Sequence, residues 1–112
     1  MKSEASFSNF SALDIRAGEI EKVEDFEKAR DPAYKIWVDF GEEIGTLKTS
    51  AKLKDLYSEE DLVGKTVVGI INFPDKQIAD FMSEFLILGA LEDDGTVVLT
   101  TEKEVEPGTE IA

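Results

Sequence analysis

The 112-residue chain contains no cysteine and no histidine. Without cysteine it can form no disulfide and offers no thiolate for catalysis or metal binding. Without histidine it lacks the commonest general base and the commonest metal ligand. Only oxygen ligands remain for a metal, and the acidic residues show no EF-hand-like spacing. We therefore expect no metal and no other cofactor, and the lack of disulfides favours a cytoplasmic protein.

Long apolar runs are also missing. No stretch approaches the roughly 18 apolar residues that a membrane span needs, so we expect no membrane insertion. Residues 1–9 are polar and lack the apolar centre of a signal peptide. The sequence has no linker or repeat, and its 112 residues are enough for one hydrophobic core. These features predict one domain over residues 7–112, preceded by a short N-terminal extension at residues 1–6.

Basic residues are scarce, because 12 lysines and arginines face 25 aspartates and glutamates, for a net charge of −13. Nucleic-acid-binding proteins usually carry a basic surface, since neutralising phosphates supplies most non-specific affinity. The whole-chain composition therefore disfavours RNA binding. Residues 28–54, however, hold six basic and four acidic residues. One basic face is thus possible on a protein whose other acids simply solvate the surface.

No set of residues forms a convincing catalytic group. Adjacent acids such as Glu42-Glu43 and Asp93-Asp94 are typical of solvated turns, whereas carboxylate catalysis needs two groups at a defined separation across a cleft. Ser50 and Ser83 have no histidine partner that could activate a hydroxyl. We therefore predict a binding protein and not an enzyme.

Short alternating segments separated by glycine-containing turns predict strands over residues 14–23, 34–40, 46–50, 66–71, 85–88 and 96–100. Ser58 and Asp61 form a weak capping box that predicts a helical turn after the third strand, and Ser8 could cap another near the N-terminus. Residues 41–45 are expected to form a hairpin turn. This order predicts a mainly β protein, a five-stranded OB-fold barrel with short helical segments.

Residues 70–90, IINFPDKQIADFMSEFLILGA, contain two apolar strand segments on either side of a polar bend. The bend is expected to bring Asn72, Lys76 and Ser83 together. On the predicted strands before it, Lys35 and Trp37 share one face, as do Lys48 and Ser50, and Lys52 follows. Such a face could bind single-stranded RNA. Alternatively, Trp37 could pack against a helix or a second subunit, and the lysines could serve only solubility.

The motif N-F-P-x-[KR]-x-I-A-x-F-x-S-E followed by an apolar strand and glycine, together with residues 13–20 (LDIRAGEI), 29–35 (ARDPAYK) and 39–41 (DFG), carries a resemblance. The chain resembles the tRNA-binding domain family, which includes the C-terminal domain of some methionyl-tRNA synthetases and the stand-alone, export-related chaperone CsaA. The CsaA-like branch is the most similar. The resemblance covers about residues 7–111 and implies an OB-fold that binds tRNA or another structured RNA.

The resemblance also implies where RNA binds. The basic position after Asn-Phe-Pro and the serine of Ser-Glu belong to the family's RNA-binding surface, which here gives Lys76 and Ser83, with Asn72 beside them. Other polar positions of that face correspond to Arg16, Lys35 and Ser50, and the strand spacing adds Lys48 and Lys52. Ser83 and Asn72 could instead only satisfy backbone groups of the loop.

The chain departs from the CsaA-like pattern at this site. It has Gln77 and Met82 where basic residues are common in the family, and it gains the acidic Asp80. Each lost phosphate contact weakens the salt-dependent attraction, so weaker RNA binding is expected.

The resemblance implies a second possibility, a homodimeric chaperone that binds unfolded or exported polypeptides. Its apolar surface would comprise Phe73, Phe81, Met82 and Phe85, although the three phenylalanines could equally form the core. Phe7, Phe10 and Trp37 are surplus apolar residues for so small a barrel, and they also favour a dimer.

Overall fold

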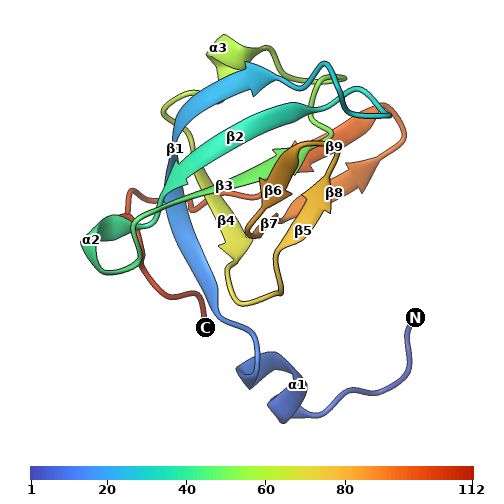
Figure 1. Ribbon diagram of the computed structural model, residues 1–112. Coiled ribbons are helices and arrows are strands. Elements are labelled where there is room, and N and C mark those ends of the chain that lie inside the picture. The colour runs from blue at the N-terminus through green and yellow to red at the C-terminus, as the bar shows by residue number, and fades with distance from the viewer.

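Five antiparallel strands form one sheet that curls into a nearly closed barrel in the computed structural model, which describes residues 1–112 (Figure 1). Their order is β3-β2-β1-β4-β7, and their bounds are β1 Ile15–Asp25, β2 Tyr34–Asp39, β3 Thr46–Ala51, β4 Thr66–Ile70 and β7 Leu86–Ile87. Two hairpins complete the chain: β5 Lys76–Ile78 with β6 Phe81–Ser83, and β8 Gly89–Glu92 with β9 Gly95–Val98. The prediction of a mainly β, OB-like barrel is confirmed.

The three helices are short: α1 Phe7–Ser11, α2 Gly41–Ile44 and α3 Glu59–Leu62. The Ser58 cap of α3 is confirmed, because the Asp61 amide donates to Ser58 Oγ at 3.2 Å. The cap of α1 is Ser6 and not Ser8, and α2 replaces the simple hairpin turn that was expected. None of the three helices has the length and apolar character that crossing a membrane requires.

The main core lies inside the barrel, where Ile36 and Val38 of β2 and Phe40, the residue that follows it, are fully buried, as the alternation predicted. The alternation of β1 is interrupted because its pairing with β2 shifts register between Ile20 and Lys22. Such a β-bulge adds one residue to a strand and changes which side chains face inward. Gly18 is needed here, since a Cβ would lie 2.6 Å from Val38 Cγ1.

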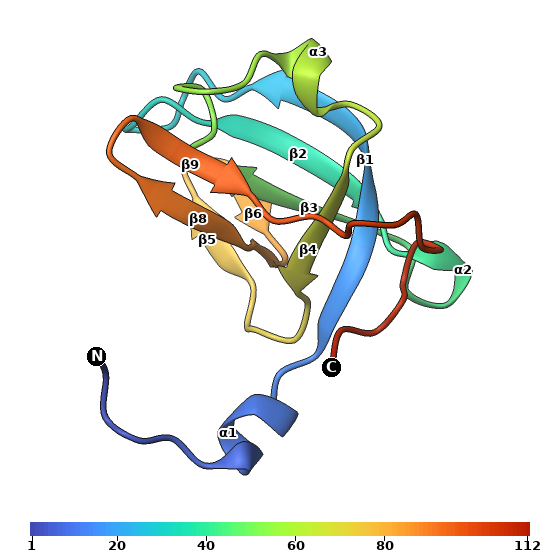
Figure 2. The same ribbon diagram turned by 180° about the vertical axis from the view of Figure 1, so that it is seen from behind.

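The C-terminal segment, residues 99–112, covers a second cluster on the outside of the barrel, formed by Ile15, Val68 and Ile70. The segment runs along β1 and bonds to it, with the Ile111 amide donating to the Ile15 carbonyl at 2.8 Å. It crosses the side of the molecule that faces the viewer in Figure 2.

The β5–β6 hairpin lies on the opposite side, facing the viewer in Figure 1, over the outer surface of β2 and β3. Its Phe81 is 6% exposed and packs against Phe26 and Trp37, with ring centroids 5.4 and 6.0 Å apart. The strands of this hairpin were not predicted, because each has only three residues and a mixed polarity. The hairpin buries Phe81 outside the barrel and forms one wall of the site described below.

A chain of hydrogen bonds closes the barrel between β3 and the segment that joins β6 to β7. Thr49, the only buried polar residue, donates from Oγ1 to the Phe85 carbonyl at 2.5 Å. Since a hydroxyl has one proton, Ser83 must donate the 2.7 Å bond that its Oγ shares with Thr49 Oγ1. The Ser50 amide in turn donates to Ser83 Oγ at 3.2 Å. We call Thr49, Ser50, Ser83 and Phe85 the seam.

Replacing Thr49 with valine tests the seam, because valine keeps the shape of threonine but removes the hydroxyl. The Phe85 carbonyl and the Ser83 hydroxyl would lose their partner, and a buried group left unsatisfied costs about 1–3 kcal/mol. We expect Thr49→Val to lower the free energy of unfolding in urea by that amount.

Thr101→Val is the matched control, because the Thr101 hydroxyl is buried and has no hydrogen-bond partner. Its removal should leave the unfolding free energy unchanged or raise it. Equal effects of the two substitutions would contradict the role of the seam.

Candidate functional site

Two adjoining cavities form a groove beside the seam, between β3 and the β5–β6 hairpin. The first has a volume of about 360 Å³ and is walled by the β1–β2 loop. The second has a volume of about 330 Å³ and reaches the loop after β4, where Phe73 and Pro74 line it. Both cavities are lined by Ser50, Lys76 and Ile78, so they are two parts of one surface.

The pairing of the hairpin decides which side chains face the groove. Lys76 is opposite Ser83 and Ile78 is opposite Phe81. Because side chains alternate along a strand, these residues share one hairpin face, while Gln77 and its partner lie on the other. Phe81 is buried against the barrel, so this shared face is the one directed toward the groove. Of the three residues that the bend was expected to bring together, Lys76 and Ser83 are paired across the hairpin, whereas Asn72 lies outside it.

The groove differs in charge from the rest of the molecule. Arg30, Lys52 and Lys76 line it, and Asp31 is the only acidic residue that does so. The whole chain, by contrast, carries a net charge of −13. Apolar side chains, among them Phe26 and Ile78, line the space between these charges. A positively charged groove with an apolar lining suits an anion that also carries flat apolar groups.

Two further cations lie next to the groove, around the ring of Phe81. Lys35 Nζ is 5.3 Å from the centroid of this ring and 5.0 Å from that of Phe26. Lys48 Nζ is also 5.3 Å from the Phe81 centroid. These distances allow cation–π attraction, which places both lysines at the same hairpin as Lys76. Neither lysine lines the two groove cavities.

Several cations of residues 28–54, one of them in the groove, form ion pairs within the protein. Lys52 Nζ lies 2.9 Å from Asp31 Oδ2, and Lys54 is paired with Asp25. Lys28 Nζ lies 2.8 Å from Asp80 Oδ2. The hydrogen bond from Lys28 lowers the pKa of Asp80, and the same bond raises the pKa of Lys28. The extra negative charge of Asp80 is therefore balanced within the protein.

Ser83 and Asn72 are occupied by structural hydrogen bonds. The Ser83 proton is used in the seam, so this hydroxyl lines the groove without a free proton to donate. Asn72 accepts from the Asp14 amide at 2.8 Å and donates to the Ala12 carbonyl at 2.9 Å. It thereby attaches the N-terminal segment to the loop after β4 and lines neither groove cavity.

Arg16 lies away from the groove. Its Nε is 2.6 Å from Asp14 Oδ1, and its Nη1 donates to the Gly108 carbonyl at 3.1 Å. The hydrogen bond to Asp14 raises the pKa of Arg16. Arg16, a predicted RNA-binding residue, therefore helps to hold the C-terminal segment against β1.

The four residues suggested for peptide binding are divided by the fold. Phe81 and Phe85 are 6% and 5% exposed, because one packs outside the barrel and the other in its core. They contribute packing and no open apolar surface. Phe73 and Met82 are 44% and 38% exposed. Phe73 lines the groove, whereas Met82 is on the hairpin face directed away from it.

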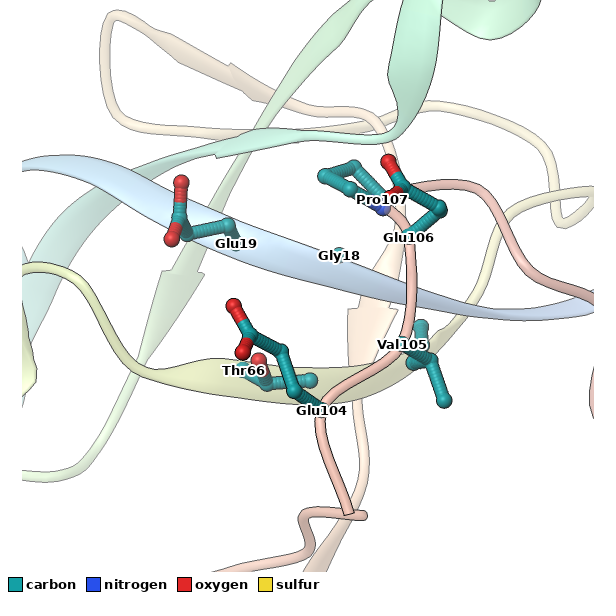
Figure 3. A pocket seen from close by; sticks show the side chains of 8 residues that line it. Gly18, Glu19, Thr66, Glu104, Val105, Glu106 and Pro107 are labelled. Atoms are coloured by element: carbon teal, nitrogen blue, oxygen red, sulfur yellow. The ribbon is translucent and has the colours of Figure 1, made fainter.

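A separate cavity of about 310 Å³ lies between β1, β4 and the C-terminal segment, and Figure 3 shows its side chains. Three carboxylates line it, those of Glu19, Glu104 and Glu106. Such a lining repels phosphate, and the structure contains no cluster of acidic residues arranged to hold a metal. The groove is therefore the better candidate for an anionic ligand.

Sequence reasoning missed Arg30, Phe26 and Ile78 as residues of the groove. Arg30 lies in the basic segment that the composition singled out, so a signal was present for it. Phe26 gave no signal. Ile78 belongs to the family motif, but its place in the groove could not be predicted because the short hairpin that brings it beside the β1–β2 loop was not predicted.

Three comparisons place these features among known proteins. The family described as "Putative tRNA binding domain" matches residues 15–110. The structure is similar to that of the CsaA chaperone protein from Picrophilus torridus, with a TM-score of 0.93 and 43% identity over 97% of this chain and 100% of the other. It is equally similar to chaperone CsaA from Bacillus anthracis, with a TM-score of 0.93 and 40% identity over 98% and 100%.

The sequence is also similar to methionine–tRNA ligase of Archaeoglobus fulgidus, with 36% identity over 110 residues. That match covers 98% of this chain but only 16% of the ligase. The similarity therefore concerns one part of the larger enzyme.

Proposed function

The chain belongs to this family of tRNA-binding domains, and we propose that it binds tRNA, or another structured RNA, in the groove without catalysing a reaction. The observation that carries the proposal is the charge of the groove. Three cations and one acid line it, on a chain with 25 acidic residues. If the basic residues served only solubility, they would not be expected to gather in one groove.

The groove offers an RNA strand two kinds of contact. Lys76 makes no ion pair with the protein and is exposed, so its ammonium is available for a phosphate. Phe73 is 44% exposed beside it and offers a ring on which an unpaired base can stack. Stacking tolerates any base, since every base has an aromatic face. Ser50 and Lys52 would face the same strand, with Lys35 and Lys48 adding charge nearby.

Lys76→Ala should weaken binding of unfractionated tRNA and flatten its dependence on salt. One phosphate contact fewer should reduce the slope of log affinity against log salt concentration by about 0.7–0.9. Fluorescence anisotropy at several salt concentrations measures both quantities.

Lys103→Ala is the control, because it removes the same charge next to Glu104, which lines the acidic cavity. It should leave the slope almost unchanged. Identical slopes for the wild type and Lys76→Ala would contradict the proposed site.

A second candidate function is chaperone-type binding of unfolded or exported polypeptides, and one observation favours it. Phe73, Met82 and Leu86 are exposed apolar residues near the hairpin, with Leu86 47% exposed. The similarity to two proteins named as CsaA chaperones supports the same proposal. Apolar contacts would carry this binding, so added salt should change it little.

Met82→Asp should then weaken the binding of a reduced, unfolded polypeptide severalfold, because a charge would replace an adaptable apolar contact. Leu91→Asp, at a position 87% exposed on β8, is the control and should have no effect on polypeptide affinity. If the two variants bind polypeptide equally well, this second function loses its support.

We also propose that the protein forms a homodimer. In Figure 1, α1 stands away from the barrel, and its Phe7 and Phe10 are 79% and 40% exposed. Trp37, by contrast, packs within its own chain against Phe81 and beneath Lys22.

Light scattering at micromolar concentration should give twice the chain mass of 12.4 kDa. Phe7→Ser should shift this mass toward that of one subunit, because it removes an exposed apolar ring. A single-subunit mass for the unaltered protein would contradict the dimer.

A further inference from the structure

Asp31 stands out because it is the only acid among the residues that line the groove, and its partner Lys52 is also part of the lining. The carboxylate meets the lysine ammonium at 2.9 Å, which is the distance expected for a charge-assisted hydrogen bond to an anion. An RNA phosphate oxygen would occupy an equivalent position relative to Lys52. Pro32 follows Asp31 and limits its backbone conformations, which helps keep the carboxylate at the groove.

The pair is exposed enough to exchange. The side chains of Lys52 and Asp31 are 70% and 59% exposed, so water competes for both charges. Exposed ion pairs of this kind contribute little to stability, and breaking one costs little. Lys52 can therefore leave Asp31 when a stronger or better-placed anion arrives.

We propose that Asp31 is an internal competitor of phosphate, which holds Lys52 in the free protein and is displaced when RNA enters the groove. The inference rests on the proposed function and concerns what limits the affinity for RNA. With Asp31 present, RNA gains Lys52 only by exchange, and the displaced carboxylate stays near the phosphate and repels it. The groove would then bind RNA firmly only when the other contacts, such as Lys76, are made as well.

The exchange also affects the salt dependence. In the free protein, Lys52 is paired with Asp31 and therefore binds no anion from the salt. When Lys52 instead neutralises a phosphate, the freed Asp31 carboxylate takes up a cation from the salt, which offsets the cation that the phosphate releases. The contact therefore adds little to the net release of ions. Without the carboxylate, the contact between Lys52 and the phosphate contributes fully to the salt dependence of RNA affinity.

Asp31→Asn tests the proposal, because asparagine is nearly the same size and carries no charge. The affinity for unfractionated tRNA should rise about two- to fivefold, the range expected from an exposed ion pair. The slope of log affinity against log salt should steepen by about 0.7–0.9. The gain should disappear in the double variant Asp31→Asn with Lys52→Ala, because the released lysine is then absent.

Glu24→Gln is the matched control. It also removes one negative charge and releases one lysine, since Glu24 pairs with Lys22 at 3.1 Å with similar exposure. Lys22 lines neither groove cavity, so this variant should give a smaller rise in affinity and no steeper slope. Circular dichroism and urea unfolding of each variant confirm that the fold is intact.

The outcomes separate the two proposals. If the wild type binds tRNA through Lys76 but Asp31→Asn behaves like Glu24→Gln, the internal competitor is refuted and the RNA-binding function stands. If the wild type binds too weakly to measure and Asp31→Asn binds, the competitor is supported. If neither binds tRNA at low salt, both proposals are overturned.

Discussion

The hydrogen-bonded seam at Thr49 is the interaction on which the rest of the structure depends. It joins β3 to the segment between β6 and β7, where the sheet has only a two-residue strand to offer. A buried hydroxyl is costly unless it is satisfied, so the seam admits essentially one register between these segments. That register places Ser83 against Ser50. Lys76 pairs with Ser83 across the hairpin, so it lines the same groove as Ser50. The groove is a direct consequence of how the barrel closes.

The arrangement of charge follows from this geometry. Cations that are up to 46 positions apart in the sequence, from Arg30 to Lys76, line one groove because the hairpin folds back over β2 and β3. Apart from Asp31, no acidic residue lines the groove, and three glutamates line the cavity under the C-terminal segment instead. The net charge of −13 therefore does not represent the electrostatic environment of a phosphate in the groove, because salt screens charges that are more than about 8–10 Å away. Phe73, which is 44% exposed, lines the same groove and supplies apolar contact area.

Much of the fold could be predicted from the sequence, because alternation along β2 and the capping residues of α3 are local signals. The bulge in β1 could be anticipated only as an imperfect pattern, and the β5–β6 hairpin could not, since three-residue strands carry too few alternations to recognise. For the site, a motif indicated Lys76 and Ser83. It could not show that Asn72 and Arg16 are bonded to backbone and neighbouring groups, or that Asp31 holds Lys52, because those contacts join segments distant in sequence.

The central claim is that RNA occupies the groove between β3 and the hairpin, and backbone amide NMR during a titration with a short single-stranded RNA tests it most directly. The account predicts that the amide signals of Ser50, Lys76 and Ile78 shift or broaden first, while those of Glu19, Thr66 and Glu104 stay in place. Perturbations concentrated at the acidic cavity, or spread evenly over the barrel, would contradict it.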